Sequence, residues 1–307
     1  MPFSSRLSPP WFSLLVSILT VLAGSFACAQ AALPEGWPAG TESHFASFGT
    51  NRVRYYTIGK DKPVLVFVHC WAGRSEFWRL QAAALADRAR LVLVDLPGHG
   101  DSDKPRVDYT MDFFARAVLA VMRDAKVEKA TLIGHSMGVA VICSVAKTAP
   151  EKVTALVAVD GLMRRPQFTP EQADQFLGQF RGADYREQTT KFIQSMFPIA
   201  GTEKLRDSVL AEILKTPQYV MLGAMQGMFS TNNPRWDLAK VSSPIIVINT
   251  TNPLWTADYQ AYIRSLSPKV EYHAITDAGH WLMLEKPAEF NTTLLEDLTK
   301  YDLIAKR

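Results

Sequence analysis

A serine between two glycines is the first feature of this sequence whose residue types could do chemistry. Residues 130–140 read ATLIGHSMGVA, so an apolar run leads to Ser136, with Gly134 two residues before it and Gly138 two residues after it. A strand that turns at once into a helix strains the backbone at the turn, and only small residues at those two positions avoid a clash. The start of the helix also points N–H groups at whatever the serine attacks. We therefore interpret Ser136 as a nucleophile and not merely as a helix cap.

A serine hydroxyl is a weak nucleophile without a base, so the chain must also supply a histidine. His280 is the best placed of the six, because it follows a strand-like run late in the chain, in ITDAGHWLMLEKP, directly after Gly279. The other histidines are His44, His135 and His273, which fit structural roles, and His69 and His99, which lie in tight turns after strands. We predict that His280 is the base.

Eight strand-like runs would position these residues. They are Phe45 to Phe48, Val53 to Ile58, Val64 to Val68, Leu91 to Val94, Thr131 to Ile133, Ala155 to Val159, Ile245 to Ile248 and Val270 to Ile275. The first two flank GTNR and predict an antiparallel hairpin. From Val64 onward the runs are continuous Val, Ile and Leu, as in parallel strands that helices cover on both faces. The helical pattern TMDFFARAVLAVMRDA, with Thr110 as N-cap, lies between two of them and indicates βαβ organisation.

Residues 161–240 contain no convincing strand pattern and predict an inserted helical cap. Helical spacing is shown by Phe192 and Met196, by Leu205 and Val209, and by Met221, Met225 and Met228. Half of the ten methionines of the chain lie in this segment. Their soft side chains suit either a malleable apolar substrate pocket or the core of the cap itself.

Four segments together resemble the α/β-hydrolase superfamily. They are FVHCWAG, VDLPGHGDSDKP, LIGHSMGVA and DAGHWLMLEKPAEFN, in this order and at these distances, and the resemblance extends from about Thr41 to Leu303. It implies an α/β fold with a mostly parallel central sheet flanked by helices. The serine nucleophile and the helical insertion resemble the branch of esterases, C–C hydrolases and cofactor-free perhydrolases. We expect neither a cofactor nor a metal.

The resemblance also implies an oxyanion hole, built from the backbone N–H groups of Trp71 and Met137. Cys70 departs from the family pattern, which usually has glycine at this position. A side chain there narrows the permitted backbone angles and crowds the hole. We assign no nucleophilic role to Cys70, because no histidine is assigned to it.

The third member of the triad is ambiguous. Relatives usually carry an aspartate after the strand that corresponds to PIIVINT, where this sequence has Asn252. An asparagine could orient His280 but would stabilise the imidazolium less than a carboxylate does. Asp160, at the end of the strand ALVAVD, and Asp258, which would need a longer or reshaped loop, compete for the role. We assign the acid to Asp160, since some relatives carry it after that strand, and leave Asp258 and Asn252 open.

Residues 1–31 match a secretory signal peptide. Arg6 precedes the uncharged run WFSLLVSILTVLAGSFA, which is short for a membrane span, and small residues follow it. We expect cleavage after Ala29 or Ala31, and hence a secreted or periplasmic protein with no stable membrane span.

The mature chain would then consist of a hydrolase core, residues 32–160 and 241–307, with the cap at 161–240 inserted between its two parts. Two cysteines, Cys70 and Cys143, would remain after cleavage, and we predict free, buried thiols because two cysteines make no disulfide framework.

Composition and charge narrow the function. The formal net charge is +3, and no run of five or six like charges indicates a nucleic-acid partner. We predict an exported serine hydrolase for a small to medium, largely apolar carboxylic ester, with thioesters, lactones or C–C bonds next to a ketone as variants. The alternative is a catalytically weak ligand-binding or sensing protein of the same fold, which Cys70 and Asn252 keep open. The sequence leaves the oligomeric state undefined.

Overall fold

The computed structural model of the chain describes residues 36–60, 63–229 and 237–306. The predicted signal peptide, residues 1–31, lies outside the described residues. The described residues all belong to one compact unit.

Eight strands form one sheet in the order β1-β2-β4-β3-β5-β6-β7-β8. They are β1 (Glu42–Phe48), β2 (Asn51–Ile58), β3 (Val64–Val68), β4 (Arg90–Val94), β5 (Ala130–His135), β6 (Val153–Val159), β7 (Ile245–Thr250) and β8 (Val270–Ile275). The β1/β2 and β2/β4 pairs are antiparallel, and every other neighbouring pair is parallel. The predicted fold class and all eight predicted strands are therefore confirmed.

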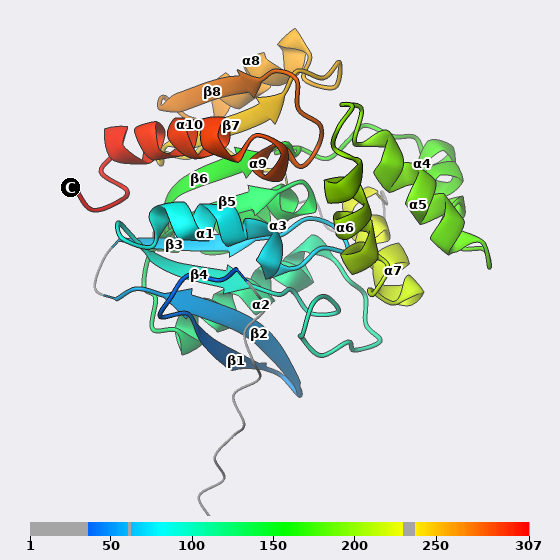
Figure 1. Ribbon diagram of the computed structural model, residues 1–307, viewed down its shortest axis with the longest axis horizontal. Helices are drawn as coiled ribbons and strands as arrows, with labels where there is room; N and C mark the ends of the chain where they lie inside the picture. The colour runs from blue at the N-terminus through cyan, green and yellow to red at the C-terminus, as the bar shows by residue number, and fades with distance from the viewer. Residues whose placement is uncertain (1–35, 61–62, 230–236, 307) are drawn as a thin grey trace, which may run out of the picture. The chain divides into compact units, whose positions relative to one another are not determined.

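Helices cover both faces of this sheet (Figure 1). They are α1 (Arg79–Leu85), α2 (Met111–Asp124), α3 (Met137–Thr148), α8 (Ala257–Leu266), α9 (Leu282–Glu285) and α10 (Pro287–Lys300), with short 3-10 turns at Ser75–Trp78 and Pro150–Lys152. Helix α1 packs against α9 and α10, whereas α2 packs against α3. The Thr110 side chain accepts a hydrogen bond from the Phe113 amide, which confirms the predicted N-cap of α2. Among the described helices, none is long and apolar enough to cross a bilayer.

The continuous Val, Ile and Leu runs are buried where both strand faces are covered. All six residues of β5 and of β7 are buried, as are all but the first residue of β3 and β4. The prediction that helices cover both faces of the strand is wrong for β8, in which only Ile275 is buried. This strand lies at the edge of the sheet, where its polar residues Glu271 and His273 remain partly exposed.

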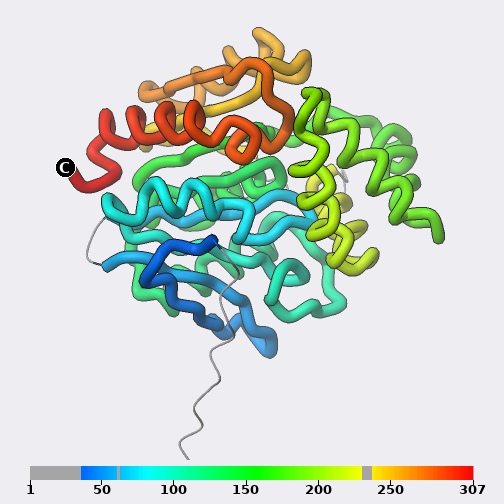
Figure 2. The backbone as a smooth tube through the Cα atoms, viewed as in Figure 1, coloured from blue at the N-terminus to red at the C-terminus, as the bar shows by residue number. Residues whose placement is uncertain are grey.

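Four helices follow β6 and precede β7: α4 (Pro170–Gly178), α5 (Tyr185–Ser195), α6 (Glu203–Ile213) and α7 (Gln218–Phe229). They gather at one end of the sheet, drawn in green to yellow in Figures 1 and 2. Thr169 starts α4 with a capping box, and its side chain accepts from the Gln172 amide. The described part of residues 161–240 contains no strand. The boundaries of the cap remain a prediction.

The cap has an apolar core of its own. Met221, Met225 and Met228 of α7 are buried, and a cluster of aromatic rings contacts the same helix through Phe229. Phe176, Phe180 and Phe192 contact one another with ring centroids 5.6 to 5.8 Å apart. Most of the methionines in the segment therefore pack as core residues.

Candidate active site

The turn between β5 and α3 holds Ser136 in a strained backbone, with φ 55° and ψ −116°. A Cβ atom at Gly134 would lie 2.4 Å from the carbonyl oxygen of Gly138, and one at Gly138 would lie 2.4 Å from the carbonyl oxygen of Val68. No side chain fits at either distance, so both glycines are required by close backbone approach. The Ser136 amide donates to the Val159 carbonyl (2.9 Å), which ties the turn to the end of β6.

His280 and Asp160 form a short hydrogen bond. The Nδ1 atom of His280 lies 2.6 Å from Oδ2 of Asp160, although the two residues are 120 positions apart in the sequence. Both side chains are largely buried, with 16% of the imidazole and 6% of the carboxylate side chain exposed. With Nδ1 donating to the carboxylate, the lone pair of the neutral ring is on Nε2. That is the tautomer a general base requires.

Asp160 itself is held from both sides. Its Oδ1 atom accepts hydrogen bonds from the Thr250 amide (2.9 Å) and the Thr250 hydroxyl (3.0 Å), so both carboxylate oxygens have donors. Burial alone would raise the pKa of Asp160, but the hydrogen bonds from His280 and Thr250 outweigh it and hold the pKa below its ordinary value. The carboxylate is therefore ionised at neutral pH.

Neither alternative acid is bonded to His280. The Oδ1 atom of Asn252 accepts from the Leu254 amide (2.9 Å) and closes its own turn. Asp258 lies in the first turn of α8, is mostly exposed, and pairs with Arg164 at 2.6 Å. Of the three residues that the sequence left open, the structure brings only Asp160 to the imidazole.

Ser136 lies at the same edge of the sheet as this pair. Its amide bonds to Val159, and its carbonyl oxygen would be 2.6 Å from a Cβ atom at Gly161, so it packs against both neighbours of Asp160. His135, the residue before it, lies 2.8 Å from the carbonyl oxygen of His280 through Nε2. The turns after β5, β6 and β8 thus converge, as expected at the carboxyl ends of parallel strands.

The Trp71 amide belongs to the loop after β3, and the Met137 amide begins α3 directly after Ser136. The loop after β3 contacts the start of α3, since a Cβ atom at Gly138 would be 2.8 Å from the carbonyl oxygen of His69. In the described part of the chain, neither amide donates a hydrogen bond to another residue. Two unengaged donors beside a serine are the components of an oxyanion hole. The Trp71 indole points into the cap, where it donates to the Met221 carbonyl (2.8 Å).

Cys70 is accommodated without backbone strain. Residues with positive φ in this loop include Ala72 (53°) but not Cys70. The thiol packs against Gly73, where a Cβ atom would lie 2.8 Å from Sγ. Burial raises the pKa of Cys70 to about 12, so the thiol stays protonated and is a poor nucleophile. Cys70 and Cys143 are both free and buried, as predicted.

Two further residues support His280: His135, to which the sequence analysis gave a structural role, and Glu285, which it did not name. Burial lowers the pKa of His135 to about 3, so this ring is neutral and donates Nε2–H to the His280 carbonyl. Glu285 accepts hydrogen bonds from the amides of Gly279 (2.8 Å) and Trp281 (3.1 Å), the two neighbours of His280. The spacing GHxxxxE was the available signal for Glu285, because a short helix returns it to the loop.

One group of three possible metal ligands lies close together within the described residues: Glu271, His273 and Asp297. Its donors are already engaged. His273 Nε2 lies 2.6 Å from Asp297, and Glu271 bonds to Lys300 and Tyr301 at 2.6 Å each. Because Lys300 already pairs with Glu271 and His273 with Asp297, we assign no metal to this group.

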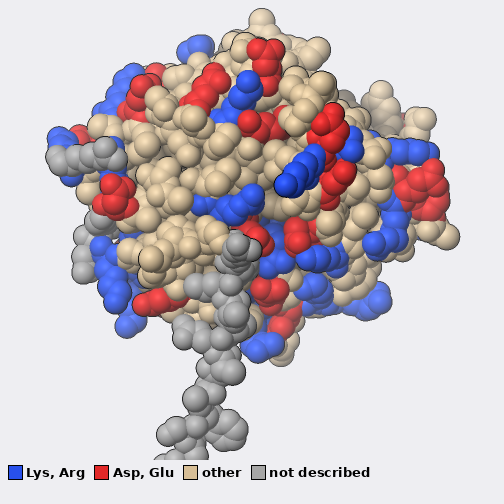
Figure 3. Space-filling model, in the orientation of Figure 1, with Lys and Arg blue, Asp and Glu red and all other residues tan. Residues whose placement is uncertain are grey.

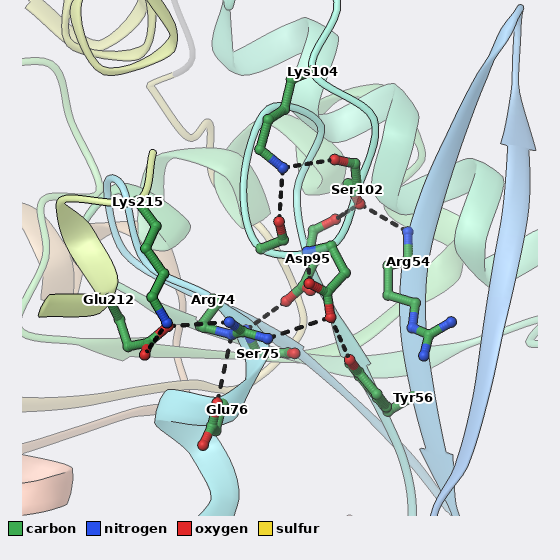
Figure 4. A network of polar contacts seen from close by, with 12 residues as sticks. Arg54, Tyr56, Arg74, Ser75, Glu76, Asp95, Ser102, Lys104, Glu212 and Lys215 are labelled. Carbon is green, nitrogen blue, oxygen red and sulfur yellow. Dashed lines mark hydrogen bonds and ion pairs between the residues drawn. The ribbon is translucent and has the colours of Figure 1, made fainter. Parts of the chain in front are cut away.

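A polar network joins the loop after β3 to the cap (Figure 4). Arg74, three residues beyond Trp71, has a side chain only 15% exposed and lies 3.1 Å from Glu212 of α6. The same guanidinium lies 3.3 Å from Asp101 and 3.5 Å from Glu76. Arg74 therefore links the β3 loop, the β4 loop and the cap.

The family model described as alpha/beta hydrolase fold matches residues 63–287. The chain belongs to this family, and it is a hydrolase of the α/β fold.

Its relatives include enzymes that act on esters. The chain is 31% identical over 242 residues to a pimeloyl-[acyl-carrier protein] methyl ester esterase of Aeromonas salmonicida, covering 73% of this chain and 87% of the relative. It is 26% identical over 265 residues to the dihydrolipoyllysine-residue acetyltransferase component of the acetoin cleaving system of Cupriavidus necator, covering 83% and 68%. The enol-lactonase of Burkholderia xenovorans has the same fold, with a TM-score of 0.73 at 18% identity, covering 83% of this chain and all of that one.

Proposed function

We propose that this chain is an exported serine hydrolase that cleaves a small to medium, largely apolar carboxylic ester, with thioesters, lactones or C–C bonds next to a ketone as variants. Ser136 is the nucleophile, His280 the base, Asp160 the acid, and the Trp71 and Met137 amides are the oxyanion donors. The observation that carries the proposal is the 2.6 Å bond between His280 and Asp160 beside the strained Ser136 turn.

The reaction follows from these positions. His280 Nε2 takes the Ser136 proton as Oγ attacks the carbonyl carbon, and the ionised Asp160 stabilises the imidazolium that forms. The developing oxyanion accepts from the two backbone amides, and a contribution of about 3 kcal/mol from one such donor is typical. His280 then protonates the leaving alcohol. Water, activated by the same imidazole, hydrolyses the acyl-enzyme.

The relatives support an ester-type substrate, since two of them are named for a methyl ester and an enol-lactone. An apolar substrate is supported by the aromatic rings of the cap, because Phe180 and Phe192 contact the Trp71 ring at 5.4 and 5.9 Å. Acidic and basic side chains are interspersed over the face seen in Figure 3, as suits a small-molecule substrate better than a polyanion.

A labelled fluorophosphonate tests the proposal, because it reacts with an activated serine and not with an idle one. The wild-type protein should be labelled and should hydrolyse members of a panel of chromogenic esters of graded acyl length. Ser136→Ala should abolish both while leaving the fold intact.

Ser208→Ala is the matched control, since Ser208 is an exposed serine on α6. This variant should be labelled and should hydrolyse the esters as the wild-type protein does. More than a few per cent of wild-type turnover in Ser136→Ala would contradict the mechanism. A wild-type protein that stays unlabelled would favour the alternative, a ligand-binding or sensing protein with this fold.

A further inference from the structure

The loop that carries His280 is in contact with the cap as well as with the core. Residues 196–198, which follow α5, lie directly on this loop and are called the cap segment below. The His280 amide donates to the Met196 carbonyl at 3.0 Å. The main-chain donor of the proposed base is thus satisfied by a residue of the cap.

The two segments approach as closely as their backbones allow. A Cβ atom at Gly279 would lie 2.4 Å from the carbonyl oxygen of Met196 and 2.9 Å from Cδ of Pro198. Only glycine leaves room for the cap segment at this distance. Gly279, beside the base, is therefore required by the cap and not by a positive φ.

Ring stacking completes the contact. The rings of Phe197 and Trp281 are nearly parallel, with an interplanar angle of 8° and centroids 4.9 Å apart. Both side chains are buried, and Trp281 directly follows His280 and meets its imidazole edge to face at 5.1 Å. The position of the imidazole is thus coupled to a ring of the cap through one intervening indole.

The core binds other main-chain groups of the same loop: the His280 carbonyl and the amides of Gly279 and Trp281. His135 donates to the His280 carbonyl, and Glu285 accepts from the Gly279 and Trp281 amides. The titratable groups that contact this loop include Asp160, His135 and Glu285, all from the core, whereas the cap segment contributes an uncharged carbonyl and an apolar ring. The cap segment can therefore affect His280 through its position and not through a charge.

We propose that Phe197 of the cap is a positioning residue for His280, so that the docked cap segment controls proton transfer and not only the fit of the substrate. This inference rests on the proposed function. A base must be held within a fraction of an ångström of its productive position, and a displacement of about 1 Å costs roughly 10²-fold in rate.

The test compares Phe197→Ala with Phe168→Ala, a truncation of another cap phenylalanine, which contacts Phe176 and Phe229 instead of the His280 loop. Phe197→Ala should lower kcat by roughly 10²-fold with little change in KM, the signature of a lost transition-state arrangement. Phe168→Ala should keep kcat. Phe197→Tyr, which retains the stacked ring, should restore most of the rate.

A second readout needs no turnover. The Nδ1 proton of His280, shared with Asp160, should give a far-downfield NMR signal that disappears in His280→Gln. It should weaken in Phe197→Ala and persist in Phe168→Ala. If the wild-type protein hydrolyses no ester but this pattern holds, the proposed function fails and the positioning role stands.

The inference is overturned if Phe197→Ala changes KM alone and leaves the NMR signal intact. Should Phe197→Ala fail to fold, Phe197→Leu and Gly279→Ala decide by the same criteria. The first keeps most of the volume without the stacked ring, and the second pushes the cap segment away from the loop. Unchanged kcat in both would likewise refute the positioning role.

Discussion

Two strained residues lie side by side at the candidate site. Ser136 and Asp160, at the ends of the neighbouring strands β5 and β6, have positive φ values of 55° and 40°. A non-glycine residue in this region costs on the order of 1–3 kcal/mol and persists only where its surroundings determine its conformation. Here the Ser136 amide bonds to Val159 and the Asp160 amide bonds to Ile248. The ladder between β5, β6 and β7 thus fixes the backbone of both residues.

The role of Asp160 leads to a prediction at the same scale. Asp160→Asn removes the charge that stabilises the imidazolium and disfavours the working tautomer, so kcat should fall by up to roughly 10⁴-fold. Asp258→Asn should cost little, because Asp258 is mostly exposed and pairs only with Arg164 among the partners the structure records. Steady-state kinetics on the same chromogenic ester measure both.

Asn252→Asp, combined with Asp160→Asn, is the informative third variant. Asn252 closes its own turn in this structure, so a carboxylate there should rescue little activity. A near-normal rate for Asp160→Asn beside a large loss for Asp258→Asn would reverse the assignment.

Sequence reasoning could propose Ser136 and His280 because each has a local signature, a glycine-flanked turn and a glycine before a histidine after a strand. It could only rank Asp160 among three candidates, since no local pattern distinguishes a strand-end aspartate that reaches His280 from one that does not. The decisive partner, Thr250, lies 90 residues away in the chain. Such a pairing depends on the β6/β7 register, which the sequence does not display.

At the scale of elements, a hydrogen-bonded pair outside the active site joins the edge strand β8 to helix α10. His273 of β8 lies 2.6 Å from Asp297 of α10, and that hydrogen bond raises the pKa of His273 above its ordinary value of about 6.5. A group whose pKa is raised on folding stabilises the protein fully below its unfolded pKa. The contribution disappears as the pH rises through the folded pKa.

His273→Gln should therefore destabilise the protein more at about pH 6 than at about pH 8. Urea unfolding of wild type and variant at both pH values measures the difference. Asp297→Asn should remove the same pH-dependent part, since the two side chains act as one pair. An equal loss of stability at both pH values would mean that His273 contributes by packing alone.

The elements themselves were largely predictable, because continuous apolar runs and the Thr110 cap are local signals. The edge strand β8 was the exception. The sequence analysis grouped VEYHAI with the buried strands, although its alternating polar residues Glu271 and His273 indicate a face that helices do not fully cover. Helices α5, α6 and α7 of the cap were predictable from spacing, whereas α4 was not. The contact of the cap with the His280 loop was not predictable either, because Gly279 has no local signature for it.

At the scale of the whole molecule, the proposed export of the chain is tested by its mass. The uncharged run and the small residues after it should direct cleavage after Ala29 or Ala31. Mass spectrometry of the protein from the periplasm or medium should find a chain that starts at Gln30 or Ala32. Exported protein that retains residues 1–20 would contradict the signal-peptide assignment.

Core and cap are joined by polar contacts as well as by the stacked rings of Phe197 and Trp281. Arg74 contacts Glu212 in the cap and Asp101 and Glu76 in the core, and Lys215 also pairs with Glu212 at 2.6 Å (Figure 4). On the core side, Arg74 forms the recorded ion pairs of Asp101 and Glu76. Burial raises the pKa of Glu76, and the charges of Arg74 and Arg79 oppose that rise. Glu212, by contrast, keeps its ion pair with Lys215 when Arg74 is lost.

This asymmetry predicts unequal effects of breaking the link from its two ends. Arg74→Met leaves Glu76 (25% exposed) and Asp101 (52% exposed) without this mostly buried guanidinium and should lower the free energy of unfolding by about 2 kcal/mol. Glu212→Gln keeps a hydrogen-bond acceptor for Arg74 and leaves the core contacts intact, so it should cost about 1 kcal/mol or less. Urea unfolding measures both, and limited proteolysis should show earlier cleavage within residues 161–240 of Arg74→Met. Equal, small losses from the two substitutions would mean that the cap is held by its apolar contacts alone, and that Arg74 serves neither the loop of Trp71 nor the docking of α6.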